Sequence, residues 1–251
     1  LLRQANGTSS VGITYAPTYS GDGRLLGVVA NLRDITKFRE AEELKSTFIS
    51  IISHELRTPV ALIKGYVGTL RRDDAAWEPS VVRDSLAVIE EESDRLADLI
   101  DDLLEASRLQ SGTPSLSLSD VDLAEIAREL VERFRTQSSL HTFEVQLPKE
   151  FPIVRADQER LTQVVSNLLS NAIKYASAGG VVKIQGRVAP HEVVLCVQDA
   201  GPGISSADRT RVFERFFRSA ETARTTQGVG LGLFLAKAVV EAHGGRIWVD
   251  E

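Results

Sequence analysis

Two long stretches of helical period, residues 37–71 and 80–110, constrain most strongly what this chain can fold into. Each carries a stripe of mainly apolar residues, which follow each other at steps of three and four and therefore share one helix face. The first stripe is Ala41, Leu44, Phe48, Ile52, Leu56, Ile63, Val67 and Leu70; the second is Val82, Leu86, Ile89, Ser93, Leu96, Ile100, Leu103 and Ser107. Because residues 71–79 read as a loop, we expect an antiparallel hairpin. One hairpin cannot cover both stripes, so we expect a second copy to complete a four-helix bundle. The helices alone do not exclude a plain coiled-coil scaffold.

One histidine, His54, projects from roughly the opposite side of the first helix, at about 100° of rotation per residue. It stands next to Glu55, in the sequence Ser-His-Glu-Leu-Arg-Thr-Pro of residues 53–59. The pair is either a surface histidine beside a surface glutamate or a reactive imidazole held towards solvent. The helix itself does not decide between these interpretations.

The remainder of the chain is predicted to be rich in β-structure. Residues 11–16 and 25–32 read as a hairpin around turn residues 20–23, too short to hold a core alone. After a helix stop and linker at 111–114, we expect strands at 116–118, 142–147, 152–156, 181–188, 192–199 and 246–250. Helices are expected at 122–137, 157–176, 205–213 and 230–243. Asp122 is expected to cap the first of these helices. This order predicts an α+β domain, with helices on one face of a mixed sheet.

Composition narrows the class of protein. Hydrophobic residues make up 43% and charged residues 25% of the chain, as in ordinary globular proteins. The net charge of −6 disfavours nucleic-acid binding, and no apolar run is long enough to span a bilayer. Cys196 is expected inside a buried strand. The chain lacks methionine, so we expect an internal fragment of a longer protein whose upstream part could include a membrane anchor.

Three polar residues at helical spacing, Asn167, Asn171 and Lys174, share one face of the predicted helix 157–176. Asparagine is a poor helix former that prefers caps and turns, so two of them within an apolar helix call for an explanation. They suit a phosphate-bound Mg²⁺, with the lysine as a charge for the phosphates. The alternative is an ordinary polar helix face.

Two glycine-rich turns follow. Asp199, Gly201 and Gly203 end a predicted strand, where a carboxylate can accept a hydrogen bond from an exocyclic amine and glycines admit a flat ring. Residues 228–233 open a helix, whose free amides favour phosphate. Either could be a plain turn.

Between these turns, residues 213–218 combine aromatic side chains with Arg215 and Arg218, which could equally be surface charges. The small polar residues of 219–227 have the composition of a mobile lid.

In order and spacing, these clusters resemble the cytoplasmic core of a sensor histidine kinase of a two-component system, over about residues 37–251. Residues 53–59 are similar to the phosphoacceptor box of that family, 167–175 to its asparagine box, 199–203 and 228–233 to its two glycine boxes, and 213–218 to its phenylalanine box. Residues 11–36, with Gly23, Gly27 and the Asp-Ile-Thr of 34–36, resemble the last strands of a PAS sensor domain. The resemblance implies a multidomain α and α+β chain: a PAS-like end (1–36), a dimerisation and phosphotransfer hairpin (37–112) and an α/β-sandwich ATP-binding domain (113–251).

The resemblance also implies roles for individual residues. His54 would take the γ-phosphoryl group of ATP, Glu55 would orient it and accept its proton, and Thr58 would place a water for dephosphorylating the partner. Asn171 would bind Mg²⁺ beside Asn167, Lys174 would reach the phosphates, and Tyr175 would pack near the nucleotide. Asp199 would accept a hydrogen bond from the adenine amine, and Gly201 and Gly203 would shape the wall of the adenine pocket. The lid side of the site would be closed by Gly228, Gly230 and Gly232. Arg215 or Arg218 would neutralise negative charge during phosphoryl transfer. The implied cofactors are ATP and Mg²⁺; the implied partners are a response regulator and a second copy, in the cytoplasm, without nucleic acid or membrane contact by this fragment.

Two other functions remain open. Gyrase- and chaperone-type ATPases share the nucleotide fold but carry a general-base glutamate four residues before the metal asparagine. Here that position is Asn167, which cannot take a proton from water. A non-catalytic scaffold that binds nucleotide is the second alternative. Val60 stands where the family often has leucine, and the family usually continues into another strand after residue 251.

Overall fold

The computed structural model describes residues 2–4, 7–72, 74–111, 116–219, 226 and 228–250. The chain divides into two compact units, residues 1–57 and 58–251, which are described separately. The predicted linker at 112–114, and residues 220–225 and 227 of the predicted lid, lie outside the described residues. The domain boundaries at 36/37 and 112/113 stay predictions.

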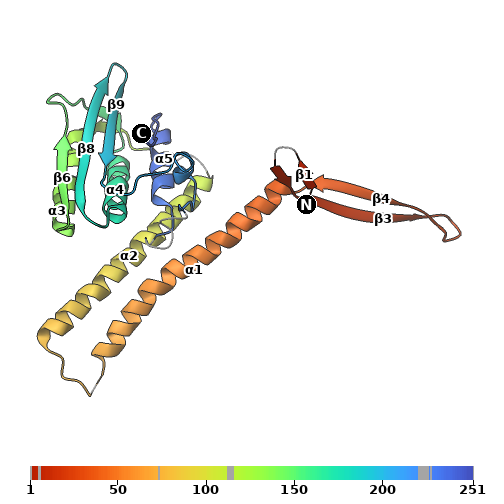
Figure 1. Ribbon diagram of the computed structural model, residues 1–251, viewed down its shortest axis with the longest axis horizontal. Coiled ribbons are helices and arrows are strands. Elements are labelled where there is room, and N and C mark those ends of the chain that lie inside the picture. Colours follow the sequence, from red (N-terminus) through yellow and green to blue (C-terminus); the bar gives the residue numbers. More distant parts are fainter. Residues whose placement is uncertain are drawn as a thin grey trace. The chain divides into compact units, whose positions relative to one another are not determined.

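The first unit contains two β-hairpins. β1 (Leu2–Gln4) pairs with β2 (Gly7–Ser9), and β3 (Val11–Tyr19) pairs antiparallel with β4 (Leu25–Asp34) (Figure 1). The predicted hairpin is confirmed, with longer strands than expected. Every residue of β4 is exposed, so the β3–β4 pair encloses no core of its own, as its size predicts.

A cluster of hydrogen bonds joins β4 to the start of α1 (Thr36–Leu70). The backbone N–H and the hydroxyl of Thr36 both donate to Asp34 Oδ1, at 2.9 and 2.6 Å, and the Thr36 hydroxyl accepts from the N–H of Ser10 at 2.9 Å. These bonds from Thr36 lower the pKa of the Asp34 carboxyl. The strand end and the first turn of the helix are therefore tied to Ser10, the residue just before β3.

The second unit begins with the rest of α1, which is joined through residues 71–78 to α2 (Pro79–Ser111) in an antiparallel hairpin (Figure 1). The predicted stripe of α2 divides into two rows. Val82, Ile89, Leu96 and Leu103 are half-buried, whereas Leu86 and Ile100 of the other row are 53% and 45% exposed. A single chain therefore covers only one row. No helix of the described residues is long and apolar enough to cross a bilayer.

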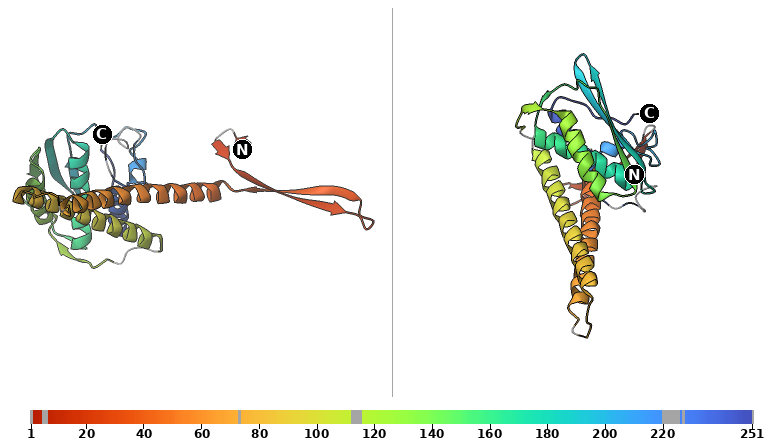
Figure 2. Two further views of the ribbon diagram at one scale, coloured as in Figure 1. Left: turned by 90° about the horizontal axis from the view of Figure 1, so that it is seen from below. Right: turned by 90° about the vertical axis from the view of Figure 1, so that its left-hand side faces the viewer.

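The α+β part contains a three-stranded sheet of β6 (His141–Gln146), β8 (Gly180–Ala189) and β9 (Glu192–Gln198). β6 runs parallel to β8, and β8 runs antiparallel to β9. α3 (Leu123–Gln137) and α4 (Gln158–Tyr175) pack on this sheet (Figure 2). The core includes Leu130, Phe134, Phe143, Val165, Leu169, Val182 and Ile184. The expected mixed sheet with packed helices is thus present.

Smaller elements complete this domain. β5 (Ser119–Val121) pairs with β7 (Val154–Ala156), and α5 (Gly232–Ala242) packs against α4. Asp122 caps α3 as predicted, because its carboxylate accepts from the N–H of Ala124 at 2.8 Å.

Three predicted elements are wrong: the strand at 116–118, the helix at 205–213 and the strand at 246–250. The strand expected at 116–118 lies at 119–121, because the N–H of Ser117 donates to Asp157 Oδ2 at 2.8 Å instead of to a strand. Residues 205–213 form turns and a short 3₁₀ helix (Arg211–Phe213) instead of an α-helix. That segment is short, and helix nucleation fixes several residues for each bond gained.

Residues 246–250 belong to no sheet within the described chain, although a strand was predicted there. Ile247 and Val249 are half-buried and their neighbours are exposed, so the period of two that suggested a strand is present in the side chains. Alternating burial shows which side chains face the protein. A strand also needs the edge of a neighbouring strand to which its backbone can hydrogen-bond, and alternation alone does not provide one.

Candidate active site

His54 presents its imidazole to solvent from α1. Its side chain is 76% exposed, whereas that of Glu55 is 10% exposed. His54 Nδ1 lies 3.8 Å from Glu55 Oε1, which is longer than a hydrogen bond. Thr58, one helical turn along the sequence, is half-buried. The buried Glu55 carboxylate therefore lies on the Nδ1 side of the imidazole.

α4 holds Asn167, Asn171 and Lys174, all partly buried. The opposite side of α4 is anchored in the core, where Leu169 is fully buried. The helix begins at the cap Asp157, whose carboxylate accepts from the N–H of Arg160 at 3.1 Å. The core and the cap therefore fix the direction in which the polar row points.

The second glycine-rich turn lies along this row of α4. Asn167 Nδ2 donates to the carbonyl of Gly232 at 3.4 Å, and a side chain at Gly228 would overlap Lys174 Nζ. Between these points, the carbonyl of Gly230 accepts from the N–H of Phe216 at 3.0 Å. The structure thus brings the predicted asparagine, phenylalanine and second glycine boxes together.

The first glycine-rich turn meets the C-terminal end of the same helix. Asp199 Oδ1 accepts from the N–H of Gly201 at 2.7 Å, and a Cβ at Gly201 would lie 3.1 Å from the carbonyl oxygen of Tyr175. Gly203 adopts a φ of +78°, which glycine tolerates and other residues rarely adopt. Asp199 and Tyr175 therefore stand next to each other at one end of the polar row.

The environment of Tyr175 is both buried and positively charged. Burial raises the pKa of its phenol, and the nearby charge of Arg218 opposes that rise. Lys174 Nζ lies 5.5 Å from the centre of the Tyr175 ring. Two cations at this end of α4 suit phosphate groups.

The two arginines of the phenylalanine box point to different places. Arg218 donates to the carbonyl of Thr226, which belongs to the predicted lid. Arg215 donates instead to the carbonyl of Ala106 on α2 at 2.9 Å, and its guanidinium lies 4.8 Å from the centre of the Phe234 ring. Burial lowers the pKa of Arg215. In this conformation, Arg218 lies near Tyr175 at the end of α4, whereas Arg215 is bonded to α2.

The oxygen donors of the site fit Mg²⁺ that is held mainly by phosphates. Among the described residues, no three histidine, cysteine, aspartate or glutamate side chains form a cluster that could hold a metal alone. The amide oxygens of Asn167 and Asn171 are hard ligands of the kind Mg²⁺ accepts, and Mg²⁺ commonly takes one or two protein ligands together with substrate phosphates.

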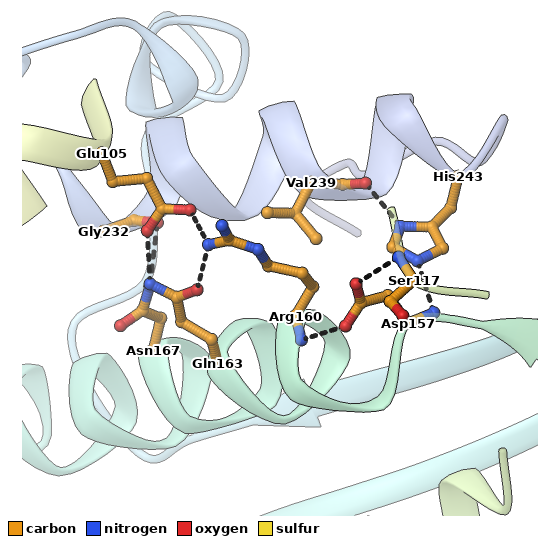
Figure 3. A network of polar contacts seen from close by, with 9 residues as sticks. All are labelled: Glu105, Ser117, Asp157, Arg160, Gln163, Asn167, Gly232, Val239 and His243. Atoms are coloured by element: carbon orange, nitrogen blue, oxygen red, sulfur yellow. Dashed lines mark hydrogen bonds and ion pairs between the residues drawn. The ribbon is translucent and has the colours of Figure 1, made fainter. Parts of the chain in front are cut away.

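Sequence reasoning missed one group of polar residues at the N-terminal end of α4. Arg160 and Gln163 both bind the carboxylate of Glu105 from α2 (Figure 3). The available signal was their spacing, because residues 160, 163 and 167 lie on one helix face. Nothing in the sequence of α2 indicated which acidic residue would reach them.

A neighbouring carboxyl on α2, Asp102, makes stability depend on pH. Burial first, and then the charges of Glu105, Asp98 and Asp101, raise its pKa from 3.8 to about 6. The folded protein therefore holds this proton more tightly than the unfolded chain, and stability is lost as the pH rises from about 4 to about 7.

We expect Asp102→Asn to stabilise the protein by about 1–2 kcal/mol at pH 8, after allowance for partial exposure, and by much less at pH 4. Urea unfolding at both pH values measures this difference. Asp94→Asn, at an exposed position of the same helix, should leave the pH dependence unchanged. An equal effect of Asp102→Asn at both pH values would contradict the assignment.

Comparison with known protein families agrees with this architecture. Residues 44–112 match the His Kinase A (phospho-acceptor) domain, and residues 156–251 match the histidine kinase-, DNA gyrase B- and HSP90-like ATPase family. The chain thus joins a phosphoacceptor helical domain to an ATPase domain, the composition of a two-component signalling kinase.

Individual relatives point the same way. The alginate biosynthesis sensor protein KinB of Pseudomonas aeruginosa is 35% identical over 94% of this chain, which spans 39% of the length of KinB. The structure of histidine kinase ThkA in complex with response regulator TrrA matches with a TM-score of 0.61, at 25% identity over 95% of this chain and 70% of that one. Full-length ShkA in complex with AMPPNP matches with a TM-score of 0.58, at 28% identity over 82% of this chain and 42% of that one. The chain belongs to the sensor histidine kinase family.

Proposed function

We propose that this chain is the core of a protein-histidine kinase that phosphorylates His54 with ATP and passes the phosphoryl group to an aspartate of a response regulator. The observation that carries the proposal is that the polar row of α4 meets the second glycine-rich turn along its length and the first at its C-terminal end, in a chain that also bears an exposed histidine on α1. The three domains are proposed with the boundaries expected from the sequence, 1–36, 37–112 and 113–251.

In the proposed reaction, His54 Nε2 attacks the γ-phosphorus of ATP. A nitrogen–phosphorus bond forms, the bond to the bridging oxygen breaks, and ADP leaves with that electron pair. Glu55 accepts the Nδ1 proton of the ring as positive charge develops on it. The 3.8 Å separation of His54 Nδ1 and Glu55 Oε1 has to shorten for this contact.

The residues along α4 have separate parts in nucleotide binding. Asn171 provides an oxygen for Mg²⁺, with Asn167 beside it; the bound ion supplies charge compensation for the phosphates. Lys174 and Arg218 add positive charge, and Arg215 joins them when it leaves α2. Asp199 accepts from the adenine amine, and Tyr175 packs at that end. The wall and the lid side are formed by Gly201, Gly203, Gly228, Gly230 and Gly232.

The partner of the phosphorylated chain is proposed to be the receiver domain of a response regulator; the ThkA structure contains such a regulator. Thr58, one turn after His54, would position a water that removes phosphate from that partner. The reactions are assigned to the cytoplasm, where ATP is available.

Transfer to histidine is favoured over hydrolysis of ATP. A hydrolase needs a base that takes a proton from water, and the amide of Asn167 has no such capacity. Its nitrogen instead donates to the carbonyl of Gly232. The decisive experiment incubates the chain with γ-labelled ATP and Mg²⁺. A kinase acquires label that is stable in base and labile in acid, whereas an ATPase releases labelled phosphate and a scaffold does neither.

We further propose a homodimer through the α1–α2 hairpin, because Leu86 and Ile100 leave one row of α2 exposed. The chain should scatter light as a dimer at micromolar concentration, and a Leu86→Glu, Ile100→Glu variant should dissociate at least about tenfold more readily, since each buried leucine or isoleucine contributes about 1.5–3 kcal/mol. Leu118→Glu, at an exposed site outside the hairpin, is the control. A monomeric wild-type chain would refute the dimer.

A further inference from the structure

The C-terminal end of α2 binds the ATP-binding domain through a carboxylate with two partners (Figure 3). Glu105 forms an ion pair with the guanidinium of Arg160, and its Oε2 accepts from Gln163 Nε2 at 2.6 Å. Arg160 also donates to Gln163 Oε1 at 3.3 Å. The Glu105 side chain is only 13% exposed, so both carboxylate oxygens are engaged in a largely buried contact.

A second contact lies at the next residue of α2. The carbonyl of Ala106 accepts from Arg215, whose guanidinium also covers the ring of Phe234 on α5. Ala106 is buried. One turn of α2 therefore engages both the start of α4 and the phenylalanine box.

The docked face of α4 continues into the nucleotide face. Residues 160, 163, 167, 171 and 174 follow each other at steps of three and four, so they lie in one row. Figure 3 shows Gln163 next to Asn167, whose amide reaches the carbonyl of Gly232. α2 thus occupies the N-terminal half of a row whose C-terminal half carries the proposed nucleotide ligands.

We propose that docking of α2 on α4 through Glu105 and binding of nucleotide are negatively coupled, with Arg215 as the group for which they compete. This inference rests on the proposed function, in which Arg215 neutralises phosphate charge. While Arg215 donates to Ala106, it is committed to α2. Nucleotide that recruits Arg215 weakens docking, and by linkage docking weakens nucleotide binding to the same extent.

The polar groups in the contact between α2 and the ATP-binding domain are of a kind that allows the contact to open. Among the described residues, its polar part is the Glu105–Arg160 ion pair with a few hydrogen bonds, beside the packing of α2 against α5, and 31% of the Arg160 side chain is exposed to water. Contacts between domains of one chain that are polar and limited in extent permit relative motion.

The test uses Glu105→Gln in the whole chain, with Mg²⁺ and a non-hydrolysable ATP analogue as the ligand in calorimetry. The variant should bind the analogue about fivefold more tightly, the lower end of typical coupling between sites. Spin labels at Arg108→Cys and Ser170→Cys, both exposed, in a Cys196→Ser background, should report a longer or broader distance between α2 and α4 in the variant. Adding the analogue to the wild-type chain should shift the distance in the same direction.

Two controls make the result specific. Glu192→Gln removes the same charge from the Arg246 pair on β9 and should change neither affinity nor distance. The double exchange Glu105→Arg, Arg160→Glu restores an ion pair of opposite polarity and should return the affinity towards that of wild type, which excludes loss of folding as the cause.

An unchanged or weaker affinity of Glu105→Gln, or an unchanged distance, overturns the coupling while leaving the kinase assignment intact. A wild-type chain that does not bind the analogue at all overturns the proposed nucleotide function itself, and the coupling with it.

Discussion

A His54→Gln chain is expected to bind ATP and to acquire no acid-labile phosphate. Glutamine keeps polarity and approximate length but has no ring nitrogen with a lone pair, so no nitrogen–phosphorus bond can form. We expect label below about 1% of that on the unmodified chain, because the reaction loses its nucleophile and not a supporting group. Filter-bound radioactivity after incubation with γ-labelled ATP, before and after acid treatment, measures this difference.

The matched control is His191→Gln, at the exposed turn between β8 and β9. It removes another accessible imidazole and should label like the unmodified chain. Nucleotide affinity should be the same in both variants, since neither histidine belongs to the nucleotide boxes. Acid-labile label that persists in His54→Gln would mean that another residue is the acceptor.

The helical part of the fold followed from the sequence because its signal is local. Both long helices lie within a residue or two of the ranges expected from their apolar period, and Asp122 and Asp157 cap the helices they precede. Segments that depend on a distant partner were less predictable. Residues 246–250 have the alternation of a strand without pairing, and Ser117 gives its N–H to Asp157, forty residues away.

The candidate site likewise has a part that the sequence predicts and a part that it does not. The row on α4 could be predicted, because three residues on one helix face need only the helical period. The direction of Arg215 could not, because its guanidinium reaches the carbonyl of Ala106, which lies 109 residues earlier in the chain. Spacing within a box identifies which residues are near each other; it does not identify which of several acceptors a long side chain will select.

Gly230→Ala is expected to weaken nucleotide binding strongly, because this position combines two requirements for glycine. Its φ is +76°, and a Cβ would lie 2.6 Å from the carbonyl oxygen of Phe217. The neighbouring Phe216 already adopts a φ of 64°, so the backbone opposite has little freedom to move away. A methyl group here would separate the second glycine box from the phenylalanine box, whose contact is the bond from Phe216 N–H to the Gly230 carbonyl.

The left-handed backbone costs about 1–2 kcal/mol for alanine, and the overlap adds about 1–3 kcal/mol. If most of that cost falls on the nucleotide-bound arrangement, affinity for the ATP analogue decreases by roughly 10- to 100-fold. Gly244→Ala separates the two causes, because Gly244 has a φ of +75° with no heavy atom within 4 Å of the added methyl. It should lower the unfolding free energy through backbone strain alone and leave nucleotide affinity unchanged. Equal losses of affinity in the two variants would show that strain, and not the contact between the boxes, controls binding.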